Sequence, residues 1–240
     1  MGLSHFELDL HIASSDKTSF RIHHIQLFDD VSNCKTLNEC IAPAAAWSAK
    51  TNFSHSPIIF FLEFKTSFWE SVRTYNVKVK ESQLRHLETA LELAWPYNIV
   101  RPSDFATTWP YPLNDANGKA IFVLKSSNDI DQYRGDVLHR MEYEDEYQTV
   151  PTKFVEIDTI RNTESIRQRA KKGTIFRYRV HKHDDSPSKT DEMERVNKAM
   201  IQMVATDHPP IANKNCCSQR KRYLQAHTSF SGNKMQEICI

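Results

Sequence analysis

Short apolar runs alternate with amphipathic helical patterns along most of this sequence, and the alternation limits the folds open to the chain. Runs rich in β-branched and aromatic residues are typical of strands, and helix-period stripes lie between most of them. Because a strand, a crossover helix and another strand in succession give parallel strands, this order predicts a largely parallel sheet. The expected strands are residues 6–12, 20–25, 57–64, 120–125, 153–158, 174–180 and 203–208.

The connections between these runs carry helix signals. Thr36 followed by Glu39 has the spacing of a capping box and predicts a helix that begins there. Leu84, Leu87 and Leu91 recur at helical spacing and predict a second helix with one buried face. The remaining expected helices cover residues 129–141, 162–172 with Gly173 as the stop, and 190–202.

A closed barrel fits this pattern better than an open nucleotide-binding sheet. The chain has only five glycines and no G-x-G-x-x-G or Walker loop, so the usual phosphate-binding turn is missing. We therefore predict an α/β fold of the TIM (β/α)8 type, one strand short, with the missing strand before Phe6. The catalytic groups of such barrels come from the C-terminal ends of strands. The polar residues expected there are Asp9, His24, Glu63, Lys125 and Arg179.

Composition and charge limit the kinds of molecule that the protein is expected to bind. The 240 residues are 40% hydrophobic and 25% charged, with 31 basic against 30 acidic residues, which is globular chemistry without the charge bias of a nucleic-acid-binding protein. No apolar run reaches the length of a membrane span, and the N-terminus has no signal-peptide pattern. We expect one barrel domain over residues 1–210. Residues 211–240 form a polar, basic tail that is predicted to be disordered.

The cysteines leave two readings open. Cys34 and Cys40 enclose a short loop whose spacing does not suit a C-x-x-C metal site, and they form either a local disulfide, which we prefer, or two free thiols. A disulfide would place the chain in an oxidising compartment. Cys216 and Cys217 lie in the tail beside the basic run QRKR. Acylation there, with attraction to anionic lipid, is the alternative to a disordered tail, and it belongs to a reducing compartment.

Three acidic residues on expected strands can be either ordinary strand residues or parts of a functional site. Glu7 and Asp9 alternate with Phe6 and Leu8 and suit a half-exposed strand as well as a site. Glu63 lies inside IIFFLEF, where a carboxylate is costly unless it is paired or bound to a metal. Periodicity therefore favours a functional role for Glu63 alone.

Several segments together resemble the bacterial type of calcium-dependent, phosphatidylinositol-specific phospholipase C. The resemblance rests on FELDLH, FRIHHIQLFDDVSNCKTLNEC, PIIFFLEFK, WPYPLNDANGKAIFVLK, GTIFRYRV and VATDHPP, which follow one another from residue 6 to about 210. This family has a TIM-barrel phosphodiesterase fold. The resemblance therefore implies the same fold as the strand pattern.

The resemblance also implies a site. Hard carboxylate ligands suit calcium, with magnesium as a second candidate. Lys125 either reaches solvent or meets phosphate, and of the two arginines on strand 174–180 one lines the site while the other pairs with Glu156 or Asp158. The implied residues are the metal ligands Glu7, Asp9 and Glu63, the catalytic groups His24, Lys125 and Arg179, and the substrate-binding groups Lys65 and Arg177.

In this family the inositol 2-hydroxyl attacks the neighbouring phosphorus, which releases diacylglycerol and leaves a cyclic inositol phosphate. The resemblance implies that His24 is the acid or stabilises the phosphorane, and that a metal-bound carboxylate is the base. The implied partner is a phosphatidylinositol-type lipid at a membrane surface. We expect a monomer there, without a membrane span or nucleic acid.

The family's first motif, S-H-N-x-Y, has no counterpart here, since Ser4-His5-Phe6 lies before FELDLH without room for a strand. We therefore expect Met1 to be an internal start in an incomplete gene or a shortened isoform. A signal peptide upstream, together with a Cys34–Cys40 disulfide, would make the protein secreted. Two alternatives remain: a glycerophosphodiester phosphodiesterase, which also places E-x-D on a strand, and a catalytically dead relative that binds lipid or protein.

Overall fold

Two stretches of nearly continuous apolar sequence, Ile58–Phe64 and Ala120–Lys125, form neighbouring parallel strands in the computed structural model of the protein. Their central residues are buried, as expected for parallel strands covered on both faces. The structure describes residues 5–12, 19–22, 34–65, 79–107, 113–125, 133, 135–143, 153–179 and 189–205. The chain divides into an N-terminal unit, Ser4–Met141, and a C-terminal unit that begins at Glu142.

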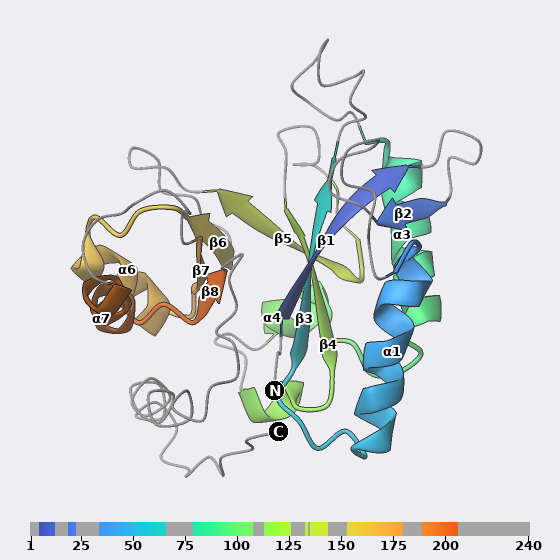
Figure 1. The fold of residues 1–240 in the computed structure, drawn as a ribbon, viewed down its shortest axis with the longest axis horizontal. Helices are drawn as coiled ribbons and strands as arrows, with labels where there is room; N and C mark the ends of the chain where they lie inside the picture. The colour runs from blue at the N-terminus through green and yellow to red at the C-terminus, as the bar shows by residue number, and fades with distance from the viewer. Residues whose placement is uncertain are drawn as a thin grey trace. The chain divides into compact units, whose positions relative to one another are not determined.

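In the described residues of the N-terminal unit, four parallel strands and one antiparallel strand pair with one another, and Figure 1 labels these strands. They are β1 His5–Ile12, β2 Phe20–Ile22, β3 Ile58–Phe64, β4 Ala120–Lys125 and β5 Leu138–Tyr143. The parallel strands follow in the order β1, β3, β4, β5, and β2 pairs antiparallel with the C-terminal end of β1. In this register Asp9 of β1 lies opposite Glu63 of β3. The predicted parallel sheet is confirmed for β1, β3 and β4.

Helices α1 (Leu37–Lys50) and α3 (Glu81–Ala94) lie side by side along this sheet (Figure 1). Their apolar stripes are buried against the sheet face formed by the even-numbered residues of β1, β3 and β4. The odd-numbered residues of the same strands point to the other face, because side chains alternate along a strand. The buried residues of this core include Leu10, Phe60, Leu62, Phe122 and Leu124 with Ile41, Leu84, Leu87 and Leu91.

Hydrogen bonds and a disulfide fix the beginning of α1. The Thr36 hydroxyl accepts a hydrogen bond from the backbone N–H of Glu39 at 3.3 Å. The Glu39 carboxylate in turn accepts one from the backbone N–H of Lys35 at 2.8 Å. The predicted cap is therefore confirmed, with Lys35 instead of Thr36 as the backbone donor. Cys34 and Cys40 form a disulfide, which confirms the preferred of the two readings.

The prediction of a helix over residues 129–141 is wrong for its described part, because Leu138–Tyr143 forms strand β5. This strand pairs with β4, with Leu138 opposite Phe122. The Glu88 carboxylate of α3 accepts hydrogen bonds from the backbone N–H groups of Val137 at 2.9 Å and Leu138 at 3.0 Å. The segment thus gains its hydrogen bonds from a neighbouring strand and a distant side chain. Local propensity does not report either partner.

Within the described residues 153–179 and 189–205, the C-terminal unit has three parallel strands and two helices. They are β6 Phe154–Ile157, α6 Thr163–Lys171, β7 Ile175–Arg179, α7 Lys189–Ala199 and β8 Met203–Ala205. The strands pair in the order β6, β7, β8. Val155, Phe176 and Tyr178 pack with Ile166 of α6 and Val196 of α7. Strands β6 and β7 and helix α6 agree with the predicted positions, and α7 ends at Ala199, before the predicted residue 202. Of the predicted strand 203–208, residues 203–205 form β8 and the others lie outside the described residues.

The ends of these elements also follow the sequence signals. The Asn162 side chain caps α6 by accepting a hydrogen bond from the Ser165 N–H at 3.0 Å. Gly173 has a φ of 102°, a backbone conformation that residues with a Cβ atom rarely adopt, and it follows the end of α6 as predicted. The short helices α4 (Pro102–Thr107) and α5 (Leu113–Ala116) were not predicted. Within the ranges that the structure describes, no helix has the length and apolar character needed to cross a membrane.

Candidate active site

Three carboxylates meet where the middle of β1 lies beside the C-terminal end of β3. Glu7 and Asp9 lie two residues apart on β1 and share a face, and Asp9 lies opposite Glu63 in the parallel register. Their neighbours Leu8 and Leu10 are buried in the core on the other face. The three side chains offer oxygen atoms that all lie within 4.8 Å of one another. The alternation of FELDLH and of IIFFLEF therefore brings together residues more than 50 positions apart.

Two lysines bind this group of carboxylates. The ammonium group of Lys125, the last residue of β4, lies 2.6 Å from Glu63 Oε2 and 3.1 Å from Glu7 Oε1. The ammonium group of Lys65 lies 2.6 Å from Glu63 Oε1 and 3.5 Å from Asp9 Oδ1. Glu63 thus receives one lysine on each of its two oxygens. We call these five residues the carboxylate–lysine cluster.

The cluster is partly open to solvent. The side chain of Lys125 is 12% exposed and that of Asp9 is 16% exposed, whereas Glu7, Glu63 and Lys65 are 26% to 30% exposed. A ligand therefore has access to carboxylate oxygens that the sheet holds in place. Three carboxylates against two ammonium groups also leave the cluster with a formal excess of one negative charge. Such an excess favours the binding of a cation.

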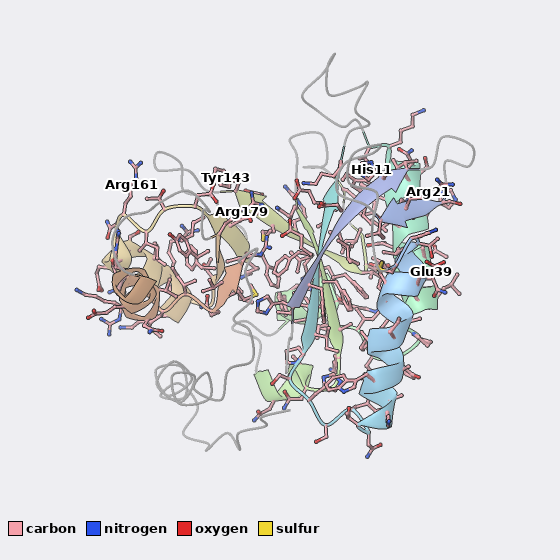
Figure 2. All side chains as sticks on the ribbon, viewed as in Figure 1. His11, Arg21, Glu39, Tyr143, Arg161 and Arg179 are labelled. Atoms are coloured by element: carbon pink, nitrogen blue, oxygen red, sulfur yellow. A yellow bond between two sulfur atoms is a disulfide. The ribbon has the colours of Figure 1, made fainter. Side chains whose placement is uncertain are left out.

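The predicted arginines lie in the C-terminal unit. Arg177 Nη1 lies 2.9 Å from Glu156 Oε1, and Arg179 Nη2 lies 3.1 Å from the same oxygen. Arg177 lies opposite Glu156 in the register of β6 and β7, and both side chains are buried. Arg179, labelled in Figure 2, is 42% exposed. The sequence left open which arginine pairs with an acid, and in the structure both pair with Glu156.

Of the histidines His11 and His24, the structure describes only His11. His24 belongs to the segment 23–33, which lies outside the described residues. His11 continues the face of Glu7 and Asp9, is buried, and lies opposite Arg21 of β2 (Figure 2). The sequence analysis gave His11 no role. The signal was present in the strict alternation of FELDLH, which assigns His11 to the same face as the two acids.

Comparison with known proteins identifies the family. The sequence profile described as "Phosphoinositide phospholipase C, Ca2+-dependent" matches residues 6–233. The chain belongs to this family. A search of curated proteins found no match.

A solved structure shows the fold of this phospholipase C family member. The calcium-dependent, phosphatidylinositol-specific phospholipase C from Streptomyces antibioticus is similar with a TM-score of 0.59 and 13% sequence identity, over 85% of each chain. At this identity the likeness establishes the fold and not the chemistry. The chain therefore has the predicted mixed α/β fold of an incomplete TIM-type barrel.

The carboxylates of the cluster suit the metal in the family's description. Calcium prefers six to eight oxygen ligands at about 2.3–2.6 Å, so two oxygens on opposite sides of one ion are about 4.8 Å apart. The oxygens of Glu7, Asp9 and Glu63 lie within that distance of one another. Their chemistry and spacing fit one calcium ion. The comparisons name calcium and give magnesium no support.

Proposed function

We propose that this chain cleaves phosphatidylinositol-type lipids to diacylglycerol and a cyclic inositol phosphate. The observation that carries the proposal is the carboxylate–lysine cluster, which lies at the C-terminal ends of β3 and β4 and beside the middle of β1. In barrels of this type, substrates bind at that end of the strands. The family description supports the reaction class, a calcium-dependent phosphodiesterase acting on phosphoinositides.

In this proposal Glu7, Asp9 and Glu63 hold calcium. The ion, when bound, lowers the pKa of the inositol 2-hydroxyl and neutralises charge on the phosphate. The carboxylates are suited to this task because they are ionised oxygen ligands fixed by paired strands. One of them would also accept the hydroxyl proton as the general base.

The cationic side chains would act on the phosphate. The 2-hydroxyl oxygen forms a bond to phosphorus, the bond from phosphorus to the glycerol oxygen breaks, and that oxygen takes a proton as diacylglycerol leaves. Lys125 and Lys65 would donate hydrogen bonds to phosphate oxygens, where charge grows in the transition state. His24 would supply the proton to the leaving oxygen. Its assignment rests on the family resemblance.

The arginines remain candidates for the same task. Arg179 is proposed to contact phosphate, and its 42% exposed side chain supports this role. Arg177 was expected to bind substrate, but its side chain is only 4% exposed and its guanidinium is bonded to Glu156. Burial favours Arg179 of the two as a direct phosphate ligand.

We also propose the compartment in which the protein acts and its oligomeric state. The disulfide between Cys34 and Cys40 supports an oxidising compartment and hence secretion. We propose that the protein acts as a monomer on the surface of membranes that contain its lipid. Gel filtration at micromolar concentration tests the oligomeric state. Fractionation of the source cells tests secretion.

The reaction is tested by phosphorus NMR of two samples with the protein and calcium, one of phosphatidylinositol vesicles and one of glycerophosphocholine. A cyclic inositol phosphate resonance in the first sample supports the proposal. Hydrolysis in the second sample alone would indicate a glycerophosphodiester phosphodiesterase. Vesicle binding without either product would indicate a catalytically dead relative. Glu63→Gln is the matched variant, because it keeps the shape of the side chain and removes its charge.

A further inference from the structure

Lys65 lies at the edge of the cluster, with its backbone held by the sheet and its ammonium group at the end of a long side chain. Its N–H donates a hydrogen bond to the Leu10 carbonyl at 2.9 Å, so the pairing of β3 with β1 continues to this residue. The side chain turns back over the strand end to Glu63 and Asp9. Four methylene groups separate the fixed backbone from the ammonium group. The ammonium group can therefore move several ångströms without any change in the sheet.

Lys125 has a different setting. Its side chain is 12% exposed, against 27% for Lys65, and both of its carboxylate contacts are at 3.1 Å or less. One of the two contacts of Lys65 is a longer 3.5 Å approach to Asp9. Of the two lysines, Lys65 has the weaker attachment and the better access to solvent.

Charge determines what happens when a divalent cation enters. Metal-free, the three carboxylates and two ammonium groups sum to one negative charge, and a calcium ion changes this sum to one positive charge. An ammonium group at hydrogen-bond distance from a carboxylate that also binds calcium would lie about 4–5 Å from a double positive charge, which is strongly repulsive in a partly buried site. Lys65 is the group that can leave without breaking the sheet.

We propose that Lys65 is an exchangeable counter-ion: it neutralises Asp9 and Glu63 in the metal-free protein and turns to the lipid phosphate when calcium binds. This inference rests on the proposed function. The single negative charge of the phosphodiester balances the positive charge that calcium leaves on the cluster. Calcium and phosphate then bind cooperatively through Lys65, and the coupling is the same in both directions.

Titration calorimetry of calcium alone, and of calcium with inositol 1,2-cyclic phosphate present, tests the coupling, because this cyclic phosphodiester carries a single negative charge. The wild-type protein should bind calcium at least about five-fold more tightly with the cyclic phosphate present, and plain inositol should have no such effect. Lys65→Met should bind calcium about ten-fold more tightly than wild type, because a repelling charge is gone, and should lose the effect of the phosphate. Lys65→Arg keeps the charge and should retain the coupling.

The control is Lys50→Met, which removes an exposed lysine at the end of α1 and should leave both affinities unchanged. If circular dichroism shows that Lys65→Met is not folded, Lys65→Gln takes its place, since it keeps a hydrogen-bond donor without charge. Equal or weaker calcium binding by these variants would overturn the proposal, as would coupling that persists in them. Calcium binding without coupling in the wild type would overturn this inference alone. An absence of calcium binding in the wild type would overturn the proposed function as well.

Discussion

A buried histidine makes the stability of the N-terminal unit depend on pH. His139 of β5 is only 5% exposed, and its Nε2 donates a hydrogen bond to the Val100 carbonyl at 2.7 Å. The ring of Phe105 lies 4.6 Å away, centroid to centroid. Burial lowers the pKa of His139 from 6.5 to about 4, although the Val100 carbonyl and the Asp104 carboxylate act in the opposite direction.

The sign and size of the effect follow from linkage. Above pH 6.5 the imidazole is neutral in the folded and the unfolded chain, so it does not change stability. Between pH 6.5 and about 4 the unfolded chain binds a proton that the folded chain excludes, and the free energy of unfolding falls as pH falls. The difference between the two pKa values corresponds to roughly 3 kcal/mol at about 1.4 kcal/mol per unit of pKa.

Urea denaturation at pH 7 and at pH 4.5, followed by tryptophan fluorescence, measures this loss. His139→Gln keeps a donor for the Val100 carbonyl and cannot be protonated in this range, so it should lose about 2 kcal/mol less than wild type over the same pH interval. His86→Gln, on the exposed face of α3, controls for the removal of a histidine as such. Equal pH dependence in wild type and His139→Gln would refute the assignment.

Three further changes test separate parts of the structure. Glu63→Gln should weaken calcium binding at least about ten-fold in calorimetry, because one of three charged ligands becomes neutral; unchanged affinity would place the metal elsewhere. Gly135→Ala should lower the free energy of unfolding by about 2 kcal/mol in urea, because the added Cβ would displace the Glu88 carboxylate, which accepts hydrogen bonds from the backbone N–H groups of Val137 and Leu138; a neutral effect would show that Glu88 does not fix the start of β5. Replacing Cys34 and Cys40 by serine should cost about 2 kcal/mol and lower Tm by several degrees; an equal Tm would mean that the disulfide does not constrain the unfolded chain.

The parts of the fold that depend on local sequence were predictable. The apolar runs of β3 and β4 were recognisable as strands because they are short and rich in β-branched and aromatic residues, and the stripe of α3 was recognisable as a helix from its period. The Thr36 cap depends on residues three positions apart, so its signal is local as well. Glu63 was recognisable because a carboxylate in an apolar strand needs a partner, and the structure provides Lys65 and Lys125 as partners.

The remainder depends on contacts between distant segments. Strand β5 was misread because Val137, Leu138 and His139 are buried in succession, so the alternation that marks a half-exposed strand is missing. The two partners of Lys125 could not be predicted either, because they lie far from it in the sequence. Its two carboxylates stand 118 and 62 positions away in the sequence, and only the register of the sheet brings them together.

The partners of the two arginines on β7 also depend on the register of the sheet. Alternation puts Arg177 and Arg179 on one face, but it does not say that both reach the Glu156 carboxylate on β6. The choice depends on the pairing of β6 with β7, which puts Glu156 opposite Arg177. The alternation in a sequence specifies which residues of one strand share a face. Which residue on the neighbouring strand they contact can be predicted only when the register of the two strands is known.

The most direct test of the function is the initial rate of cyclic inositol phosphate formation from phosphatidylinositol vesicles, measured against free calcium for wild type and Glu63→Gln. We expect a rate that rises with calcium to saturation in the wild type and falls to background when calcium is chelated. In Glu63→Gln the same rate should need much more calcium. A rate that does not depend on calcium, or that is the same in Glu63→Gln, would contradict a calcium site at Glu7, Asp9 and Glu63.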